Sequence, residues 1–274
     1  MLIHVLRSPF LYAGIIGLLI LSAILHPWQR SSAAVSLPSD GTPRPVVVEL
    51  FTSEGCSSCP PADALLKRLS EQQPVEGVHV IALEEHVDYW NHLGWADPFS
   101  SNTFSQRQDD YARSFGADGV YTPQMIVDGQ FEFVGNRGGE ARDTIQKAAN
   151  LPKLEVGVSS VPGSGEGKAT VEVQISNPQG IAPREASELW AAITETNLQS
   201  DVKAGENSGE TLKHAAVVRS LRKVETLRDL SGYQQHVDLS IDSRWKKEDL
   251  VVVIFVAEKN SHKIIGVGSA ALRP

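Results

Sequence analysis

The only two cysteines of the chain lie in one four-residue turn, Cys56–Cys59, with the sequence Cys-Ser-Ser-Cys. An apolar run, 46–51, precedes this turn, and a helical pattern begins near Pro60. At a strand-to-helix junction, backbone N–H groups lie close enough to the sulfurs to stabilise a thiolate. Any fold of this chain therefore has to present a dithiol between a buried strand and a helix.

The spacing of the two cysteines disfavours a structural role. In the chain-entropy treatment, closing so short a loop contributes only about 2 kcal/mol, against roughly 4.7 kcal/mol for a loop of 100 residues. A structural zinc site needs four ligands, and the sequence contains no second CxxC. We therefore interpret the pair as a redox-active dithiol.

Length and charge narrow the class of protein. A chain of 274 residues is long enough for one or two domains, and its 41% hydrophobic content is sufficient for a core. The net charge is −8, and no basic patch stands out in the sequence. We therefore predict that the protein does not bind nucleic acid.

The N-terminal segment 1–34 has the features of a targeting sequence. Arg7 precedes an apolar stretch, 10–25, which as a helix would span about 24 Å, less than the roughly 30 Å hydrocarbon core of a bilayer. The small residues 32–34 resemble a cleavage site. We predict a signal peptide cleaved near Ala34, with an uncleaved membrane anchor as the alternative. Either way the folded part lies outside the cytoplasm, periplasmic or secreted, where disulfides persist.

Residues 35–44 read as a Pro- and Gly-containing linker, and 45–151 as an α/β domain. Near-continuous apolar runs indicate buried strands, helical spacing of apolar residues indicates helices, and Asp128-Gly129 indicates a hairpin turn. The predicted order is strand 45–51, helix 62–72, strand 78–83, helix 103–115, hairpin 124–127 and 131–134, and helix 139–150.

Residues 152–274 have a different residue pattern, with short runs rich in β-branched residues separated by clusters of turn-forming residues. Several strands at such spacing are typical of a β-sandwich, so we predict a β-sandwich-like C-terminal domain. The seven predicted strands are 154–161, 169–175, 189–194, 215–224, 235–241, 250–257 and 264–270.

The motifs of the chain resemble a family of secreted bacterial proteins classed as a domain of unknown function within the thioredoxin-like superfamily. The resemblance covers about residues 45–274. It is carried by 49–63 around the CxxC, by 86–99 with His-Val-Asp-Tyr-Trp, by 121–129 with Tyr-Thr-Pro-Gln, and by 205–219 with Gly-Glu-Asn. It implies an α/β thioredoxin-like fold and an extracytoplasmic location, and it assigns no activity.

The resemblance also implies roles for individual residues. Cys56 would be the attacking thiolate and the more exposed sulfur, and Cys59 would be the resolving thiol. Thr122 and a cis Pro123 would bind an extended substrate. From its position after the second predicted strand, Trp90 could line a substrate groove or pack a long loop onto the core. We expect no cofactor and no resident metal ion. We expect protein thiols or disulfides as substrates, an unidentified redox partner, and contact with a membrane only through an uncleaved N-terminal segment.

His86 is an auxiliary candidate, as a proton shuttle or as a third metal ligand beside the two sulfurs, although the favoured interpretation is that it only caps or forms local hydrogen bonds. Glu84 and Glu85 read as solvated or paired rather than catalytic. A second polar cluster, 206–219, contains Glu206, Asn207, His214 and Arg219. It could contact the α/β domain or a ligand, or it could satisfy a long loop.

Three residues depart from the thioredoxin pattern. Pro60 and Pro61 lack N–H groups, so we expect the helix to begin one or two residues late. Glu54 would oppose a second negative charge on Cys56. Both effects predict a reducing couple, with a Cys56 thiol pKa above about 5.

Two functions compete. The first is an envelope thiol–disulfide oxidoreductase that uses the CxxC dithiol. The second is a non-enzymatic binding module, in its sharpest form a Cu(I) chaperone, because soft thiolates select Cu(I) and an imidazole can complete the site. A thiol peroxidase is disfavoured because no Thr-x-x-Cys element is present.

Overall fold

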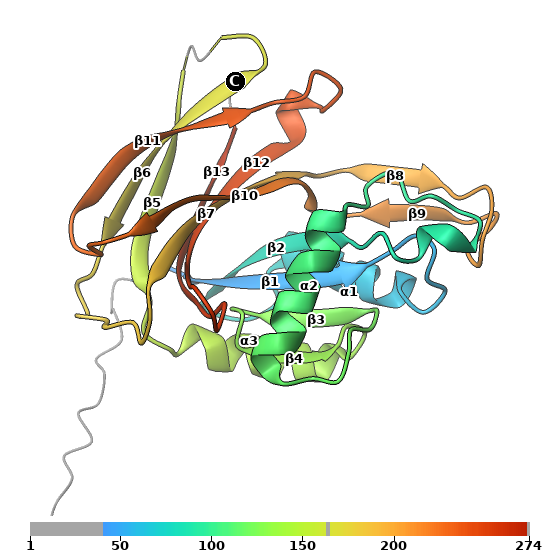
Figure 1. Ribbon diagram of the computed structural model, residues 1–274, viewed down its shortest axis with the longest axis horizontal. Coiled ribbons are helices and arrows are strands. Elements are labelled where there is room, and N and C mark those ends of the chain that lie inside the picture. The colour runs from blue at the N-terminus through green and yellow to red at the C-terminus, as the bar shows by residue number, and fades with distance from the viewer. Residues whose placement is uncertain (1–40, 163–164, 273–274) are drawn as a thin grey trace, which may run out of the picture. The chain divides into compact units, whose positions relative to one another are not determined.

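The computed structural model describes residues 41–162 and 165–272 (Figure 1). The predicted signal peptide or anchor, 1–34, lies outside the described residues, as does linker segment 35–40. Among the residues that are described, no helix combines the length and the apolar character needed to cross a membrane.

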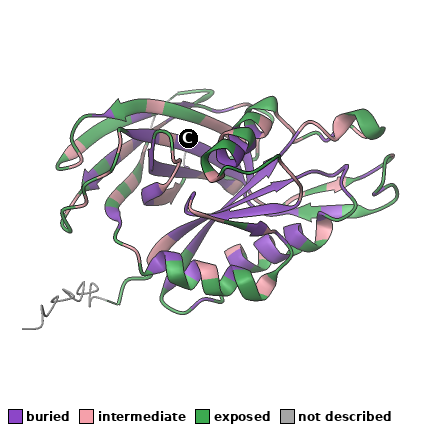
Figure 2. Ribbon diagram, turned by 60° about the horizontal axis from the view of Figure 1, so that its bottom comes forward, coloured by how far each residue is buried: buried purple, intermediate pink, exposed green. Residues whose placement is uncertain are grey.

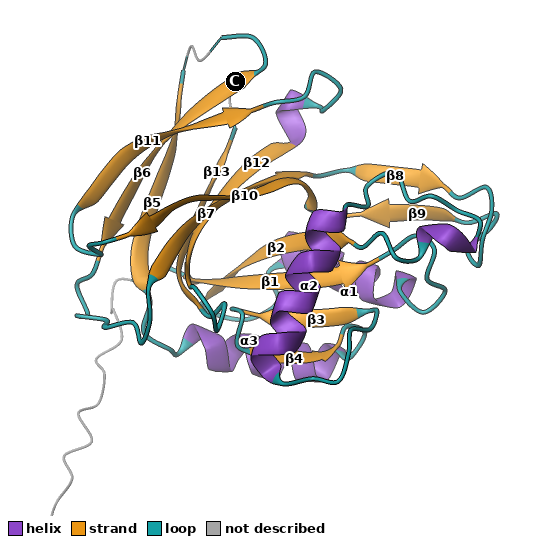
Figure 3. Ribbon diagram, viewed as in Figure 1, coloured by secondary structure: helices purple, strands orange, loops and turns teal. Residues whose placement is uncertain are grey.

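The described chain is a mixed α/β protein with a large mixed sheet and a separate two-stranded ribbon (Figure 3). The sheet has the strand order β11-β6-β5-β13-β12-β7-β10-β2-β1-β3-β4, and the ribbon pairs β8 with β9. The helices are α1 (Pro60–Gln72), α2 (Asn102–Phe115) and α3 (Gly138–Ala149), with short 3-10 turns at Asn91–Leu93 and Lys247–Asp249. The strands are β1 (Arg44–Thr52), β2 (Val78–His86), β3 (Gln124–Val127), β4 (Phe131–Val134), β5 (Leu154–Val161), β6 (Lys168–Ser176), β7 (Ser187–Glu195), β8 (Leu198–Asp201), β9 (Thr211–His214), β10 (Val217–Leu227), β11 (Tyr233–Ser240), β12 (Leu250–Glu258) and β13 (Ile264–Ala271).

Strand β1 is buried on both faces, as its continuous apolar run predicts. It pairs parallel with β2 and antiparallel with β3. Because successive side chains point to opposite faces, Val48 and Leu50 pack with the core under α1 and α3, whereas Val47 and Phe51 face the other side of the sheet. Figure 2 shows buried residues along these central strands, so the turn that follows β1 starts from a rigid support.

The strands of the second half join the same sheet. All seven predicted runs are strands, and β10 lies beside β2 through the parallel pair Val217 and Glu84. The sheet curves back on itself, since Arg222 on β10 donates a hydrogen bond to the backbone carbonyl of Asp238 on β11. Apolar side chains from β5–β7 and β11–β13 fill the concave side. Where the sequence predicts a sandwich, the described strands thus form one curved sheet that is continuous with the first half.

A buried cation on α2 connects that helix to both halves of the sheet. Arg107 Nε donates to Glu49 Oε1 at 2.6 Å, and Tyr111 donates to the other Glu49 oxygen at 2.5 Å. The guanidinium also lies over the rings of Trp190 on β7 and Phe255 on β12. Burial lowers the pKa of Arg107, but the Glu49 charge outweighs it and the net shift is upward, so the cation is firmly retained.

We expect Arg107→Met to lower the free energy of unfolding by about 3–5 kcal/mol, because it leaves the Glu49 carboxylate buried without its cation. Urea denaturation measures the change. The control is Arg113→Met on the same helix, whose exposed ion pair with Asp110 contributes less than about 1 kcal/mol. Equal losses for the two variants would contradict the proposed role of Arg107.

Candidate functional site

The two cysteines are joined in a disulfide at the carboxyl end of β1, with their Cα atoms 5.5 Å apart. Cys59 is the N-cap of α1, and its carbonyl accepts hydrogen bonds from Ala62 and Asp63. The helix begins at Pro60, so the expected late start is wrong. Proline is tolerated at the first helical positions because their N–H groups have no partner within the helix.

Of the residues predicted at the site, Thr122 contacts Cys56 and Trp90 contacts Thr122. Thr122 Oγ1 donates to Cys56 Sγ at 3.3 Å, and the indole N–H of Trp90 donates to Thr122 Oγ1 at 2.9 Å. The Thr122–Pro123 peptide bond is cis, as predicted. Trp90 also packs on the turn, since a Cβ atom added at Gly55 would lie 3.2 Å from Trp90 Cβ.

Both sulfur-bearing residues are buried. Cys56 is 1% exposed and Cys59 is 0% exposed, whereas Ser57 and Ser58 between them face solvent. Cys56 is thus the more exposed of the two only by this small margin, and both residues are buried in the oxidised state. A loop from a distant part of the sequence contacts the backbone of this turn, and we call this loop the cover.

The cover is the loop of the β8–β9 ribbon, which sequence reasoning did not predict as strands. Asn207 donates from Nδ2 to the backbone carbonyls of Glu54 and Cys56, at 2.8 and 3.0 Å. The Ser57 N–H donates to Glu206 Oε2 at 3.1 Å. Two members of the second-half polar cluster thus contact the CxxC turn directly. This confirms the contact with the α/β domain that the sequence left open.

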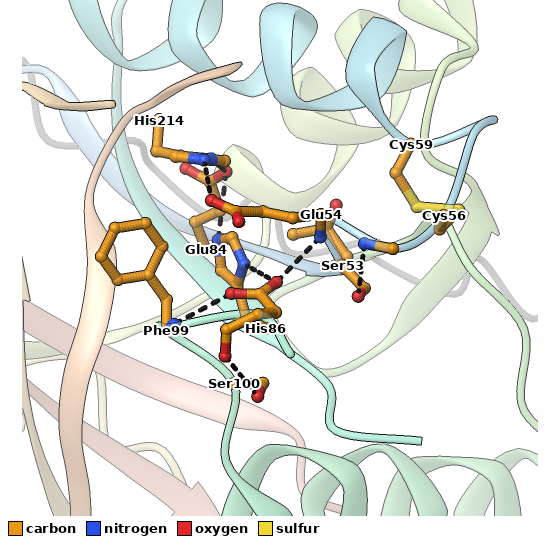
Figure 4. A network of polar contacts seen from close by, with 12 residues as sticks. Ser53, Glu54, Cys56, Cys59, Glu84, His86, Phe99, Ser100 and His214 are labelled. Carbon is orange, nitrogen blue, oxygen red and sulfur yellow. Dashed lines mark hydrogen bonds and ion pairs between the residues drawn. A yellow bond between two sulfur atoms is a disulfide. The ribbon is translucent and has the colours of Figure 1, made fainter. Parts of the chain in front are cut away.

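Behind the turn lies a buried network of two imidazoles and three carboxylates (Figure 4). His214 pairs through Nδ1 with Glu84 Oε1 at 2.9 Å and through Nε2 with Glu54 Oε1 at 3.1 Å. His86 Nδ1 lies 2.7 Å from Asp97 Oδ2, and the same oxygen accepts the backbone N–H of Glu54 at 2.8 Å. The network therefore connects the strand ends of both halves with the residue two positions before Cys56.

This network changes the interpretation of two predicted residues. The Glu54 carboxylate is held by His214 and by the Trp95 indole N–H, which donates to Oε2 at 2.7 Å. Figure 4 shows it directed toward His214 rather than toward the disulfide, so its expected opposition to a Cys56 thiolate is offset by a cation. His86 lies on the far side of Glu54 from the sulfurs in Figure 4, so it does not converge with them on a shared metal position.

The charges in the network stabilise one another. Burial alone would raise the pKa of Glu84, but His214 and His86 lower it to about 2. Burial opposes protonation of His214, yet its hydrogen bonds to Glu54 and Glu84 raise its pKa to about 9. Burial also lowers the pKa of His86, but the Asp97 carboxylate outweighs this effect and the pKa lies well above its usual range.

Arg219, the fourth member of the polar cluster, lies beside the network. Its guanidinium stands 3.6 Å from Glu195 and over the Phe99 ring. The Phe99 ring packs edge-on against both His86 and His214. Phe99 and Arg219 thus shield the imidazoles on one side, and the backbone N–H of Phe99 also donates to Asp97 Oδ1 at 2.9 Å.

Sequence reasoning underestimated Glu84 and did not single out Asp97. The predicted strand ends at Leu83 because three ionisable residues follow, but β2 continues to His86 and all three are buried. Glu85 remains apart from the network near Arg107, and burial followed by the Glu49 charge raises its pKa well above the usual value. A run of ionisable residues that directly continues a buried strand is the signal that could have indicated a buried polar site.

The acid Asp63 lies one turn into α1, where Thr52 Oγ1 donates to it at 2.6 Å. Burial, followed by the charge of Glu84, raises its pKa from 3.8 to about 7, while Thr52, His214 and His86 act in the opposite direction. A pKa raised in the folded state means that ionisation favours unfolding, so stability is lost as the pH rises through about 7.

We therefore expect Asp63→Asn to become more stable than the wild-type chain as the pH rises from 4 to 8, by on the order of 3 kcal/mol at the upper end. Asparagine keeps an acceptor for Thr52 and cannot ionise. Denaturant unfolding of both proteins across this range measures the difference. A difference that does not change with pH would contradict the raised pKa of Asp63.

Fold and site together define a mixed α/β protein with a CxxC disulfide at a strand-to-helix junction. The chain belongs to the family described as protein of unknown function (DUF1223), which matches residues 47–257. No curated protein matches the sequence significantly.

Two solved structures are similar over most of the chain. A crystal structure of a protein from Agrobacterium tumefaciens is 27% identical, with coverage of 83% of this chain and 93% of that one and a TM-score of 0.62. HBP35 of Porphyromonas gingivalis is 18% identical, with coverage of 84% and 76% and a TM-score of 0.64. At that identity the second likeness shows a shared fold and nothing about activity.

Proposed function

We propose that the protein is an extracytoplasmic thiol–disulfide oxidoreductase with a thioredoxin-like first half. The observation that carries the proposal is the Cys56–Cys59 disulfide at the end of β1, with Thr122 and the cis Pro123 beside Cys56. The element order β1-α1-β2-α2-β3-β4-α3 and the strand order β2-β1-β3-β4 support a thioredoxin-like assignment. The extracytoplasmic location is supported by the sequence of residues 1–34.

The proposed reaction begins from the reduced dithiol. The Cys56 thiolate attacks one sulfur of a substrate disulfide, a mixed disulfide forms, and the other substrate sulfur leaves as a thiolate. The Cys59 thiolate then attacks Cys56 Sγ, which releases the second substrate thiolate and forms the Cys56–Cys59 disulfide. The substrate gains two electrons and the dithiol loses two; a reducing partner of the dithiol class restores the starting state.

Neighbouring groups support this role for Cys56. The hydroxyl of Thr122 donates to its sulfur, and Ser58 Oγ lies 3.3 Å from the same atom. Hydrogen bonds to a thiolate favour the charged form. Pro60 and Pro61 supply no N–H groups that could add to these hydrogen bonds. A reducing couple, with a Cys56 thiol pKa above about 5, remains a prediction.

Trapping tests the proposal. We expect Cys59→Ser, expressed as the full chain, to accumulate mixed disulfides through Cys56 with extracytoplasmic proteins, because the resolving thiol is absent. Non-reducing electrophoresis followed by identification of the trapped partners measures this. The double variant Cys56→Ser/Cys59→Ser is the control and should trap nothing. An empty trap from Cys59→Ser would overturn the oxidoreductase and favour a binding module.

The buried disulfide implies that access depends on the ribbon loop. We expect Asn207→Ala to increase the rate of disulfide reduction by glutathione by about tenfold, because it removes a donor shared by two buried carbonyls and so facilitates local opening. The matched control is Asn150→Ala, at the exposed end of α3. Equal rates for Asn207→Ala and the wild-type chain would show that the loop does not limit access.

A further inference from the structure

We propose that Glu84, His86 and His214 form a binding site for a divalent transition-metal ion such as Zn²⁺. One ligand atom from each residue lies within 4.8 Å of the others, and all three side chains are buried. Glu84 and His86 are two positions apart on β2 and therefore share a face of that strand, while His214 ends β9. This proposal is independent of the dithiol chemistry.

Two of the three donor separations are close to those of a zinc centre. Glu84 Oε1 lies 2.9 Å from His214 Nδ1 and 3.6 Å from His86 Nε2. Tetrahedral coordination with bonds of about 2.0–2.1 Å places neighbouring donors about 3.3–3.4 Å apart. The two measured separations lie on either side of that value, so shifts of a few tenths of an ångström would bring these two pairs to the required spacing.

One atom of this cluster has no hydrogen-bond partner among the described residues. His86 Nε2 is fully buried and faces Glu84 at a distance beyond hydrogen bonding. A buried polar atom without a partner costs about 1–3 kcal/mol. A metal ion bound between Glu84, His86 and His214 would use this nitrogen as a ligand and so remove that cost.

Neighbouring groups orient the three side chains through hydrogen bonds, as is usual for metal ligands. The second nitrogen of each imidazole faces a carboxylate, Asp97 for His86 and Glu54 for His214. Glu84 Oε2 accepts the backbone N–H of Ala215 at 2.7 Å, which leaves Oε1 toward the imidazoles. Metal-binding histidines almost always donate their other N–H to a carboxylate, a carbonyl or water, which sets the ring orientation and raises ligand basicity.

The donor set selects the class of ion. Two imidazole nitrogens and one carboxylate oxygen suit Zn²⁺, whereas Cu(I) prefers thiolates, and Mg²⁺ and Ca²⁺ prefer oxygen ligands only.

The test uses the full chain as Cys56→Ser/Cys59→Ser, so that no thiolate can bind the metal. After treatment with a chelator, we expect calorimetry to give one Zn²⁺ per chain, and Co²⁺ to give the intense visible absorption of a tetrahedral N/O site. Adding His86→Gln or His214→Gln should weaken Zn²⁺ binding roughly 100-fold or more, and Asp97→Asn roughly 10- to 100-fold.

The matched control is His79→Gln, an exposed position near the start of the same strand β2, which should leave binding unchanged. If either histidine variant fails to fold, two measurements on the cysteine-free chain still test the site. These are its Co²⁺ spectrum and the rise of its melting temperature with Zn²⁺. If the cysteine-free chain binds no Zn²⁺, the proposed site is overturned. It is also overturned if His79→Gln abolishes Zn²⁺ binding while His86→Gln retains it. Because this chain lacks both sulfurs, its result is separate from that of the trapping experiment.

Discussion

Glu84 is the residue on which the joining of the two halves depends. Its backbone N–H donates to Ala216 at 3.0 Å, and its Oε2 accepts the N–H of Ala215 at 2.7 Å. Its other oxygen faces His214 and His86. A fully buried carboxylate is tolerated only when it is paired and hydrogen-bonded, and here the partners come from β2 itself and from the segment that links β9 to β10. The same side chain therefore anchors the pairing of β10 with β2 and organises the polar network behind the disulfide.

Because the second half is anchored there, the ribbon that precedes β10 reaches the CxxC turn. Asn207 binds two carbonyls of that turn, and Glu206 accepts the N–H of Ser57. The disulfide site is thus built by both halves of the chain: the first supplies the cysteines, Thr122 and Pro123, and the second supplies the cover. In this arrangement both cysteines of the disulfide are buried.

Local pattern predicted most of the elements. The apolar run before Cys56, the spacing of Leu65 and Leu69, and the seven runs after residue 152 correspond to β1, α1 and the strands of the second half. Prediction failed at the ribbon, where β8 and β9 are four residues each and mostly polar. It failed also at the end of β2, because three consecutive ionisable residues contradict burial unless partners from elsewhere are known. Those partners belong to segments far away along the chain, which a single sequence does not place.

By itself the sequence determined the local order of strands and helices and put a dithiol at a strand-to-helix junction, because periodicity and residue spacing act over a few positions. The tertiary structure alone decided that Cys56 is buried, that Glu54 is neutralised by a cation, and that His86 lies with Glu84 and His214 rather than with the sulfurs. Each of these outcomes depends on contacts such as Glu54 with Asn207 and with His214, which are 153 and 160 positions apart. Burial and charge compensation arise from groups brought together in space, and so they follow from the packing of the two halves rather than from any segment of the chain.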